Sequence, residues 1–240
     1  MEIKIKKPEV LNKIIKYCSQ LNEECEVKFD IDKIYIRALH KSNVMLSNII
    51  IDKKLFDDYK VEEKVTTTFN FEIFTKICNS MKKGFILTDN QTEFIITSLD
   101  GKTTRGIKKY VLPEDERTDP PHSNNIISVD YDALMDALSD SLQVDEVIQI
   151  DINENRFVIR NKGNLETFES ILDGKSDENI NLFISSKFFA NAMALSGMNK
   201  KIDLYLAQTS PFYFEITGEN IFIKTWIAPR MENENDNTNN

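Results

Sequence analysis

The sequence has few of the residues that carry most enzyme chemistry. Its 240 residues include two histidines, His40 and His122, three cysteines and seven glycines. It contains no glycine-rich phosphate loop, no G-x-S-x-G nucleophile motif, no H-E-x-x-H zinc motif and no EF-hand calcium loop. Neither histidine lies in a recognisable motif. The sequence therefore predicts a protein without catalysis, bound metal or cofactor.

The cysteines do not form a metal-binding or disulfide pattern. Cys18, Cys25 and Cys78 are odd in number, lack C-x-x-C spacing and lie in apolar patterns. They predict reduced core thiols in an intracellular protein rather than a zinc site. No apolar run reaches the roughly 20 residues of a membrane-spanning helix, and the N-terminal residues show no apolar signal core.

The net charge of −9 limits how the chain could meet nucleic acid. An acidic protein does not bind DNA over its whole surface, although it can concentrate lysines on one face. The last ten residues, Met231–Asn240, are polar and acidic without periodicity, which predicts a disordered tail. An apolar content of 41% is sufficient for packed cores.

A proline-rich stretch divides the chain. Leu112–Asn125 reads LPEDERTDPPHSNN and holds three of the six prolines, so it predicts an extended, exposed connector. The segments on either side each have a normal domain size of about 110 residues. We predict domains at 1–111 and 126–230, separated by a connector at 112–125 and followed by the tail at 231–240.

Both segments show the same order of elements, which predicts an α+β fold of two similar domains with antiparallel sheets and two helices each. The predicted helices are Pro8–Leu21, Phe71–Lys83, Tyr131–Leu142 and Lys187–Ser196. Their start signals are Pro8, Asn70, Asp130 and Ser185 or Ser186, and their stop signals are Gly84 and Gly197. The predicted strands are Glu2–Lys6, Glu26–Asp30, Lys33–Leu39, Val44–Ile51, Thr66–Asn70, Phe85–Thr88, Glu93–Ser98, Thr103–Leu112, Ile126–Val129, Glu146–Ile152, Arg156–Asn161, Leu165–Ile171, Asn181–Ile184, Lys201–Leu206, Pro211–Thr217 and Asn220–Ile227.

One helix carries an acidic face. Asp132, Asp136 and Asp140 are spaced i, i+4 and i+8, so they share one side of the predicted helix. Three carboxylates could hold a divalent cation, but metal sites normally draw ligands from several elements. A solvated acidic face is the simpler interpretation.

Three local motifs resemble one known family. The chain closes with Thr225–Arg230 (TWIAPR), contains Leu39–Leu46 (LHKSNVML), and places Ser210–Pro211 before a phenylalanine. Together with the length and the position of the connector, these segments resemble sliding clamps of the proliferating cell nuclear antigen (PCNA) type, of archaea and eukaryotes. The resemblance covers the whole chain.

The resemblance implies a function. Such a protein is a non-catalytic processivity factor that encircles duplex DNA as a pseudo-sixfold ring of three subunits inside the cell. Helices line the hole and strand edges, here Thr103–Leu112 and Leu165–Ile171, pair across subunits. It is loaded by a clamp loader and tethers DNA polymerase, flap nuclease and ligase through short interaction peptides in replication and repair.

The resemblance also implies site residues. The positions that would face DNA are Lys13, Lys16, Lys76, Lys82, Lys83 and Lys187. The pocket for partner peptides would be formed by Leu39, Asn43, Val44, Leu46, Pro211, Trp226, Ala228 and Pro229. Because Trp226 is the only tryptophan and lies near a chain end, we expect it to be partly exposed as a contact residue.

The sequence departs from the family pattern at two places. In the family, the connector usually carries aliphatic residues that help close the partner pocket, and this connector lacks them around Arg117–Pro121. Asp136 stands where a basic residue is common. We therefore consider a mixed ring completed by a more basic paralogue, beside a ring of identical subunits. A clamp-like checkpoint or transcription-associated ring, a metal-dependent hydrolase using the aspartate face and a β-rich interaction module remain as alternatives.

Overall fold

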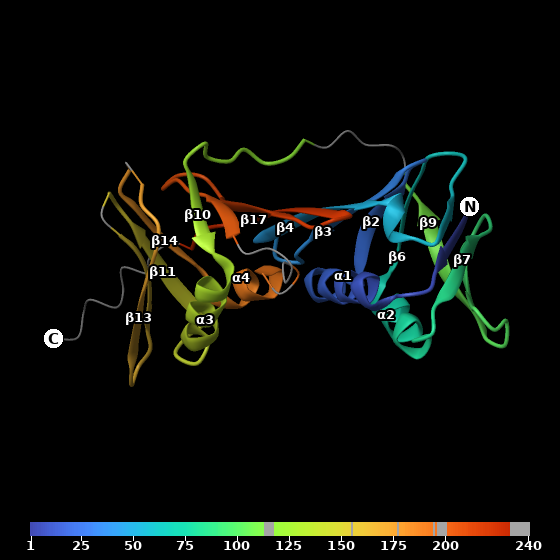
Figure 1. Ribbon diagram of the computed structural model, residues 1–240, viewed down its shortest axis with the longest axis horizontal. Coiled ribbons are helices and arrows are strands. Elements are labelled where there is room, and N and C mark those ends of the chain that lie inside the picture. The colour runs from blue at the N-terminus through green and yellow to red at the C-terminus, as the bar shows by residue number, and fades with distance from the viewer. Residues whose placement is uncertain (113–117, 155, 177, 194, 196–200, 231–240) are drawn as a thin grey trace. The chain divides into compact units, whose positions relative to one another are not determined.

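A computed structural model describes residues 1–112, 118–154, 156–176, 178–193, 195 and 201–230 (Figure 1). The chain forms two compact units. The N-terminal unit comprises Met1–Thr118 and Thr217–Lys224, and the C-terminal unit comprises Asp119–Ile216 with the segment that starts at Thr225. The predicted ends of the last helix at Ser196 and Gly197, and the predicted tail, lie outside the described residues.

The N-terminal unit is built from antiparallel strands and two helices. Its strands follow one another in the order β4-β3-β2-β6-β9-β8-β7-β1-β5. A return segment of the chain belongs to the same unit, since the Asp52 amide donates to the Asn220 carbonyl at 2.9 Å. The elements are β1 Glu2–Ile5, α1 Glu9–Leu21, β2 Glu24–Phe29, β3 Lys33–Leu39, β4 Met45–Asp52, η1 Lys53–Leu55, β5 Asp58–Lys60, β6 Val65–Asn70, α2 Phe71–Ser80, β7 Phe85–Asp89, β8 Glu93–Ser98 and β9 Thr104–Val111.

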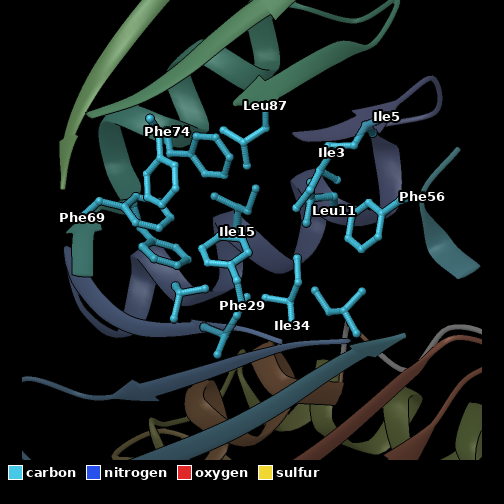
Figure 2. A pocket seen from close by; sticks show the side chains of 15 residues that line it. Ile3, Ile5, Leu11, Ile15, Phe29, Ile34, Phe56, Phe69, Phe74 and Leu87 are labelled. Atoms are coloured by element: carbon cyan, nitrogen blue, oxygen red, sulfur yellow. The ribbon is translucent and has the colours of Figure 1, made fainter. Parts of the chain in front are cut away.

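The core of this unit forms between its strands and helices because the sequence alternates. In β3, every second residue (Ile34, Ile36 and Ala38) is buried, as period-two patterning requires. Figure 2 shows aliphatic and aromatic side chains from β1, α1, α2 and several strands converging around a void of about 30 Å³. Phe69 packs against Phe71 and Phe94, with ring centroids 4.7 and 5.0 Å away. A void of this size that is lined only by apolar groups is compatible with a dry, closely packed core.

The first helix agrees with the prediction and the second ends early. In α1 the predicted stripe of Leu11, Ile14, Ile15, Cys18 and Leu21 is buried. The second helix, α2, begins after Asn70, whose side chain accepts a hydrogen bond from the Ile73 amide at 2.8 Å, but it ends at Ser80 rather than Lys83.

Gly84 explains the geometry after α2. Its φ of +96° is in the left-handed region, and its amide donates to the Met81 carbonyl at 2.9 Å. An added Cβ would lie 2.3 Å from the Ile5 carbonyl oxygen, so only glycine fits. Gly84 therefore closes a turn that follows the helix, and Lys82 and Lys83 belong to that turn.

The C-terminal unit has the same ingredients. One run of strands has the order β10-β15-β16, and a separate four-stranded sheet has the order β13-β12-β11-β14. Asp130 caps α3 as predicted, because its side chain accepts from the Ala133 amide at 3.0 Å. The elements are β10 Ile126–Asp130, α3 Tyr131–Ser141, β11 Val147–Ile152, β12 Phe157–Lys162, β13 Thr167–Leu172, β14 Ile180–Ser185, α4 Ser186–Met193, β15 Lys201–Tyr205, β16 Phe212–Thr217 and β17 Ile221–Ile227, the last two of which pass from one unit to the other.

The predicted α+β class with antiparallel sheets is confirmed. The sequence missed η1 and β5, which are too short to show a period. The hairpin strand predicted to begin at Leu165 begins at Thr167, and Leu165 is fully exposed. All three cysteines are buried and free, as predicted, and burial raises the pKa of the Cys78 thiol to about 12. No helix within the described ranges combines the length and apolarity needed to span a membrane.

Candidate nucleic-acid and partner interfaces

The helices of the N-terminal unit present lysines to solvent. Lys13 and Lys16 are exposed on α1, on the side away from its buried stripe. Lys76 is exposed on α2 and pairs with Glu72 one turn earlier, at 2.6 Å. Lys82 and Lys83 are exposed in the turn after α2. Because α1 and α2 contact each other, five of the six predicted DNA-facing lysines belong to one helix pair and its following turn.

In the C-terminal unit, one helix carries the opposite charge. Asp132, Asp136 and Asp140 are all exposed on α3, as the spacing predicted. Lys187, the sixth predicted lysine, is exposed in the first turn of α4, which contacts α3. Among the residues that the structure describes, no group of three or more His, Cys, Asp or Glu side chains could hold a metal ion. The aspartates therefore form a solvated face there.

The loop after β3 holds half of the predicted peptide pocket. It is closed by hydrogen bonds from the His40 amide to the Met45 carbonyl at 2.8 Å and from the Asn43 amide to the His40 carbonyl at 2.7 Å. Asn43 adopts a left-handed φ of 58°, which asparagine tolerates better than most residues. The tight loop leaves Leu39 and Asn43 exposed and Val44 half-buried, whereas Leu46 is buried.

His40 supports this loop through its neutral form. The Ser42 amide lies 3.2 Å from its Nδ1, an arrangement in which the imidazole nitrogen accepts the hydrogen bond. Burial, and secondarily the charge of Lys41, lower the pKa of His40. Lys41 is held by Glu23 at 2.7 Å. The loop conformation is therefore coupled to the protonation state of one histidine.

The other half of the predicted pocket belongs to the C-terminal unit, and it corrects our expectation for Trp226. This side chain is only 3% exposed and stacks on Tyr213, with ring centroids 4.7 Å apart. Its Nε1 is buried and has no hydrogen-bond partner among the described residues. The prediction of a partly exposed tryptophan was wrong because the ring packs against a neighbouring strand. Pro211 is half-buried, and Ala228 and Pro229 are exposed.

The sequence missed the role of His122. In the described part of the connector, its imidazole lies 4.2 Å from the Tyr213 ring and 5.6 Å from the Tyr205 ring, measured between centroids. The connector residues from Asp119 onward belong to the C-terminal unit. One signal was available, since His122 is the only aromatic side chain between residues 112 and 125.

Each unit has a strand with an unpaired edge. In β9, Thr104–Lys108 pairs with β8, and β6 joins the other edge only at Lys109–Val111. Among the described strands, β13 pairs with β12 alone. Unpaired amides and carbonyls in these edges are available to another strand.

Exposed apolar side chains lie around both edges. Near β9 they are Ile73, Tyr110 and Val111, with exposures of 47, 59 and 64%. In the C-terminal unit they are Leu142 just after α3, Leu165 in the turn before β13, and Ile171 on β13, with exposures of 42, 101 and 65%. A surface hollow of about 480 Å³ lies beside the open part of β9, lined by Ile73, Lys76, Ile77, Ser80, Arg105 and Gly106. Clustered apolar exposure of this kind is typical of a protein contact surface.

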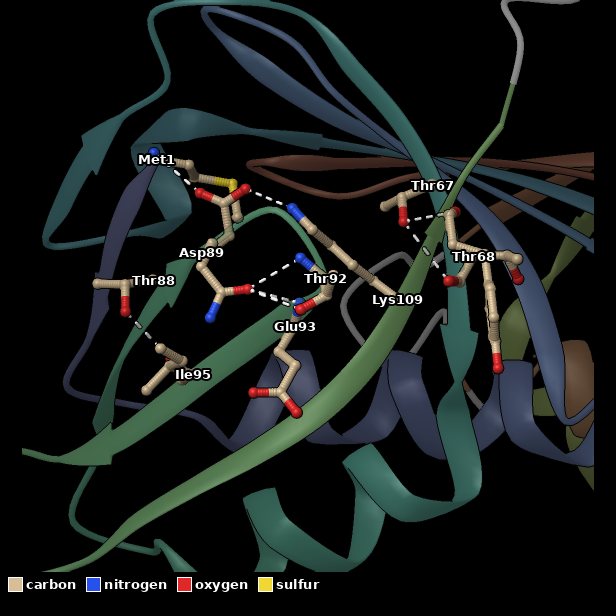
Figure 3. Close-up of polar contacts among 11 residues, drawn as sticks. Met1, Thr67, Thr68, Thr88, Asp89, Thr92, Glu93, Ile95 and Lys109 are labelled. Atoms are coloured by element: carbon tan, nitrogen blue, oxygen red, sulfur yellow. Dashed lines mark hydrogen bonds and ion pairs between the residues drawn. The ribbon is translucent and has the colours of Figure 1, made fainter.

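A buried ion-pair network fixes β9 in place. Figure 3 shows the Lys109 side chain reaching Asp89, which also meets the Met1 amino group; the distances are 2.5 and 3.0 Å. Lys109 is 7% exposed and lies over the Phe94 ring, 5.0 Å from its centroid. Burial acts to raise the pKa of Asp89, but the hydrogen bonds from Lys109 and the terminal amine outweigh it and lower the pKa. The network ties β9 to the end of β7.

Comparisons with known proteins agree with this architecture. Residues 1–113 match the family described as "Proliferating cell nuclear antigen, N-terminal domain". The DNA polymerase sliding clamp of Pyrococcus horikoshii is 23% identical over 91% of this chain and 94% of its own length. The sliding clamp of Methanococcus maripaludis is 24% identical over 92 and 95%.

Solved structures give the same result for the fold. The proliferating cellular nuclear antigen of Entamoeba histolytica matches with a TM-score of 0.80 and 16% identity over 96% of this chain and 98% of its own. A. fulgidus PCNA, solved with the C-terminal region of FEN-1, matches with a TM-score of 0.82 and 16% identity over 97 and 99%.

Antiparallel strands and paired helices in both units thus define a DNA clamp fold. The family match in the N-terminal half and the full-length relatives point the same way. Taken together, these similarities support a sliding clamp of the PCNA family.

Proposed function

We propose that this chain is a DNA polymerase sliding clamp that encircles duplex DNA and tethers replication and repair enzymes. It acts on DNA inside the cell, as one of three subunits in a ring. In this proposal, residues 1–111 and 126–230 are the two clamp domains and residues 112–125 connect them. The relatives named DNA polymerase sliding clamps support this function.

The proposal of a ring rests mainly on the open strand edges of β9 and β13, which differ from each other. The β9 edge with Ile73, Tyr110 and Val111 differs from the β13 edge with Leu142, Leu165 and Ile171, so contact between copies is head to tail. A heterologous contact of this kind generates a ring when its rotation closes. Strand pairing would satisfy the open backbone groups and cover the apolar side chains. One chain carries both edges, so a second copy suffices as partner.

DNA contact is assigned to the lysines of α1, α2 and the turn after α2. Ammonium groups on helix faces neutralise phosphates without reading bases, which suits a protein that must slide. The described lysines of this set are exposed, and Lys76 alone is paired with a helix neighbour. Lys187 extends the set to α4.

Partner binding is assigned to the predicted pocket residues, with Val44 as the most informative position. Val44 is half-buried at the end of a loop closed by hydrogen bonds, where it can contact a peptide without being part of the core. Val44→Asp should weaken binding of a Gln-x-x-aliphatic-x-x-aromatic-aromatic peptide by about 2 kcal/mol or more, because the bound peptide would remove the new carboxylate from water. Calorimetric titration checks this; unchanged affinity in a folded variant contradicts the assignment.

The hydrolase alternative finds no support in the described residues, where no group of three or more His, Cys, Asp or Glu side chains, the α3 aspartates included, could hold a metal ion. Retention on DNA tests the proposed function directly. The purified chain, with a clamp loader of a related system and ATP, should stay on nicked circular DNA through a high-salt wash. It should be lost when the same DNA is linearised. Equal retention on both DNAs would indicate simple surface binding and contradict the clamp.

A further inference from the structure

One aromatic side chain of the connector, His122, packs on the C-terminal unit. His122 lies in a corner formed by Tyr213 and Tyr205, tilted 35° to the first ring and 83° to the second. Offset stacking and edge-to-face contact are the two geometries that aromatic pairs favour. His122 itself is exposed, so the contact is made on the surface of the unit.

The two tyrosines that His122 contacts are themselves held by neighbouring side chains. Tyr213 is fully buried and is backed by Trp226, while Tyr205 packs beside it at 4.9 Å. The Tyr213 hydroxyl donates a hydrogen bond to Glu215, which fixes the tilt of the ring. Burial, and secondarily this bond to Glu215, raise the pKa of Tyr213, so the hydroxyl stays protonated. The Tyr213 ring is therefore held by Trp226 on one side and by the hydrogen bond to Glu215 at its hydroxyl end.

The backbone around His122 restricts the described end of the connector, residues 118–125. Pro120 and Pro121 precede it and restrict their own φ angles and the conformations of their neighbours. Three residues later, Asn125 accepts from the Leu206 amide at 3.1 Å and donates through Nδ2 to Ser176 Oγ at 2.7 Å. Asn125 thus anchors the end of the connector, and His122 attaches the part before it.

We propose that His122 is a latch that positions the connector through aromatic packing, in place of the aliphatic contacts that this connector lacks. The latch is a positioning residue for partner peptides, so this inference rests on the proposed peptide binding. It makes partner affinity depend on an aromatic ring at position 122: phenylalanine replaces histidine, whereas alanine and leucine do not.

The first test detects the latch without any peptide. Because the chain has two histidines, imidazoles labelled with ¹³C at Cε1 alone give two signals, and the His122→Ala spectrum assigns them. A ring 4.2 Å from Tyr213 should show an upfield ring-current shift relative to the same signal in guanidinium-unfolded protein. An unshifted His122 signal in the folded protein overturns the latch. Tyr213→Leu should abolish the shift.

The second test measures peptide affinity in the full chain. With the peptide used for Val44, His122→Ala and His122→Leu should each raise Kd about tenfold, and His122→Phe should stay within about twofold of the wild type. Asn124→Ala, an exposed neighbour, is the matched control and should have no effect. Equal affinities for the Ala, Leu and Phe variants overturn the positioning role. If the wild-type chain binds no peptide, the proposed peptide site and the role of His122 in peptide binding are both wrong. The imidazole spectrum still tests the contact between His122 and Tyr213 independently.

Discussion

The two helix pairs of this chain have the same architecture and opposite charge. In the N-terminal unit, α1 and α2 with their following turn expose Lys13, Lys16, Lys76, Lys82 and Lys83. In the C-terminal unit, α3 exposes Asp132, Asp136 and Asp140, and α4 contributes Lys187. The buried sides of both pairs are apolar, so the fold does not depend on which charged residues occupy the solvent-facing sides. The comparison separates what the fold requires from what DNA contact requires.

Both units should contribute equally to assembly, whatever their charge. Tyr110→Glu in one unit and Ile171→Glu in the other should each place a charge in the contact and dissociate the ring, an effect of several kcal/mol. Ile31→Glu changes an equally exposed isoleucine in the β2–β3 hairpin and should leave the ring intact. Analytical ultracentrifugation at micromolar concentration measures the difference. A trimer that survives both edge substitutions would remove β9 and β13 from the interface.

DNA affinity should depend on the N-terminal helices. Lys13→Ala, Lys16→Ala and Lys76→Ala combined should leave assembly intact and lower the slope of log affinity against log salt by roughly one per lost phosphate contact. Fluorescence anisotropy with a short duplex at several salt concentrations gives the slope. Lys53→Ala and Lys54→Ala, in η1, form the control. An unchanged slope would place the α1 and α2 lysines away from DNA.

Reversing one of the three charges on α3 should reduce the charge difference between the units. Asp136→Lys replaces an exposed carboxylate with an ammonium at the middle of the acidic face. If α3 lies near DNA, affinity should rise several-fold at low salt, and the gain should fade as the Debye length shortens to about 8 Å in physiological salt. Asp145→Lys, exposed outside α3, is the control. No gain for Asp136→Lys would mean that this face does not meet DNA.

The smallest expected effect is the pH response of the β3–β4 loop. His40 has a lowered pKa in the folded chain, so the unfolded chain binds more protons as pH falls. Stability from the neutral imidazole is complete above the unfolded pKa of about 6.5 and decreases below it. His40→Asn keeps an acceptor for the Ser42 amide, and the part of the pH 7.5 to 5.5 stability loss due to His40 should disappear. Thermal unfolding at both pH values checks this; the same slope in both proteins contradicts the coupling.

Local patterns predicted most elements because their cause is local. Alternation identified β3, and the Asn70 and Asp130 caps placed the starts of α2 and α3 correctly. The predicted end of α2 was wrong because glycine is required at position 84 by the nearby Ile5 carbonyl, which is distant in sequence. Gly84 does not mark the end of the helix. The short β5 pairs with β1, more than fifty residues away, and has too few residues to show a pattern.

Predictions for the sites depended on which side chains find partners. The exposure of the helix lysines followed from the position of the buried stripe, so it could be read from the sequence. The burial of Trp226 could not, since it depends on Tyr213 in the neighbouring strand. The contact of His122 with Tyr213 and Tyr205 joins positions more than eighty residues apart, and no local pattern reports it.

The most direct test of the account is the mass of the particle that this chain forms alone. Light scattering on the purified chain at micromolar concentration should give about 83 kDa, three times the chain mass of 27.8 kDa. After loading, the same trimer should remain on circular DNA and leave it when the circle is cut. A monomer or weak dimer that becomes a ring only with a paralogue would contradict assembly from identical subunits and support the mixed ring.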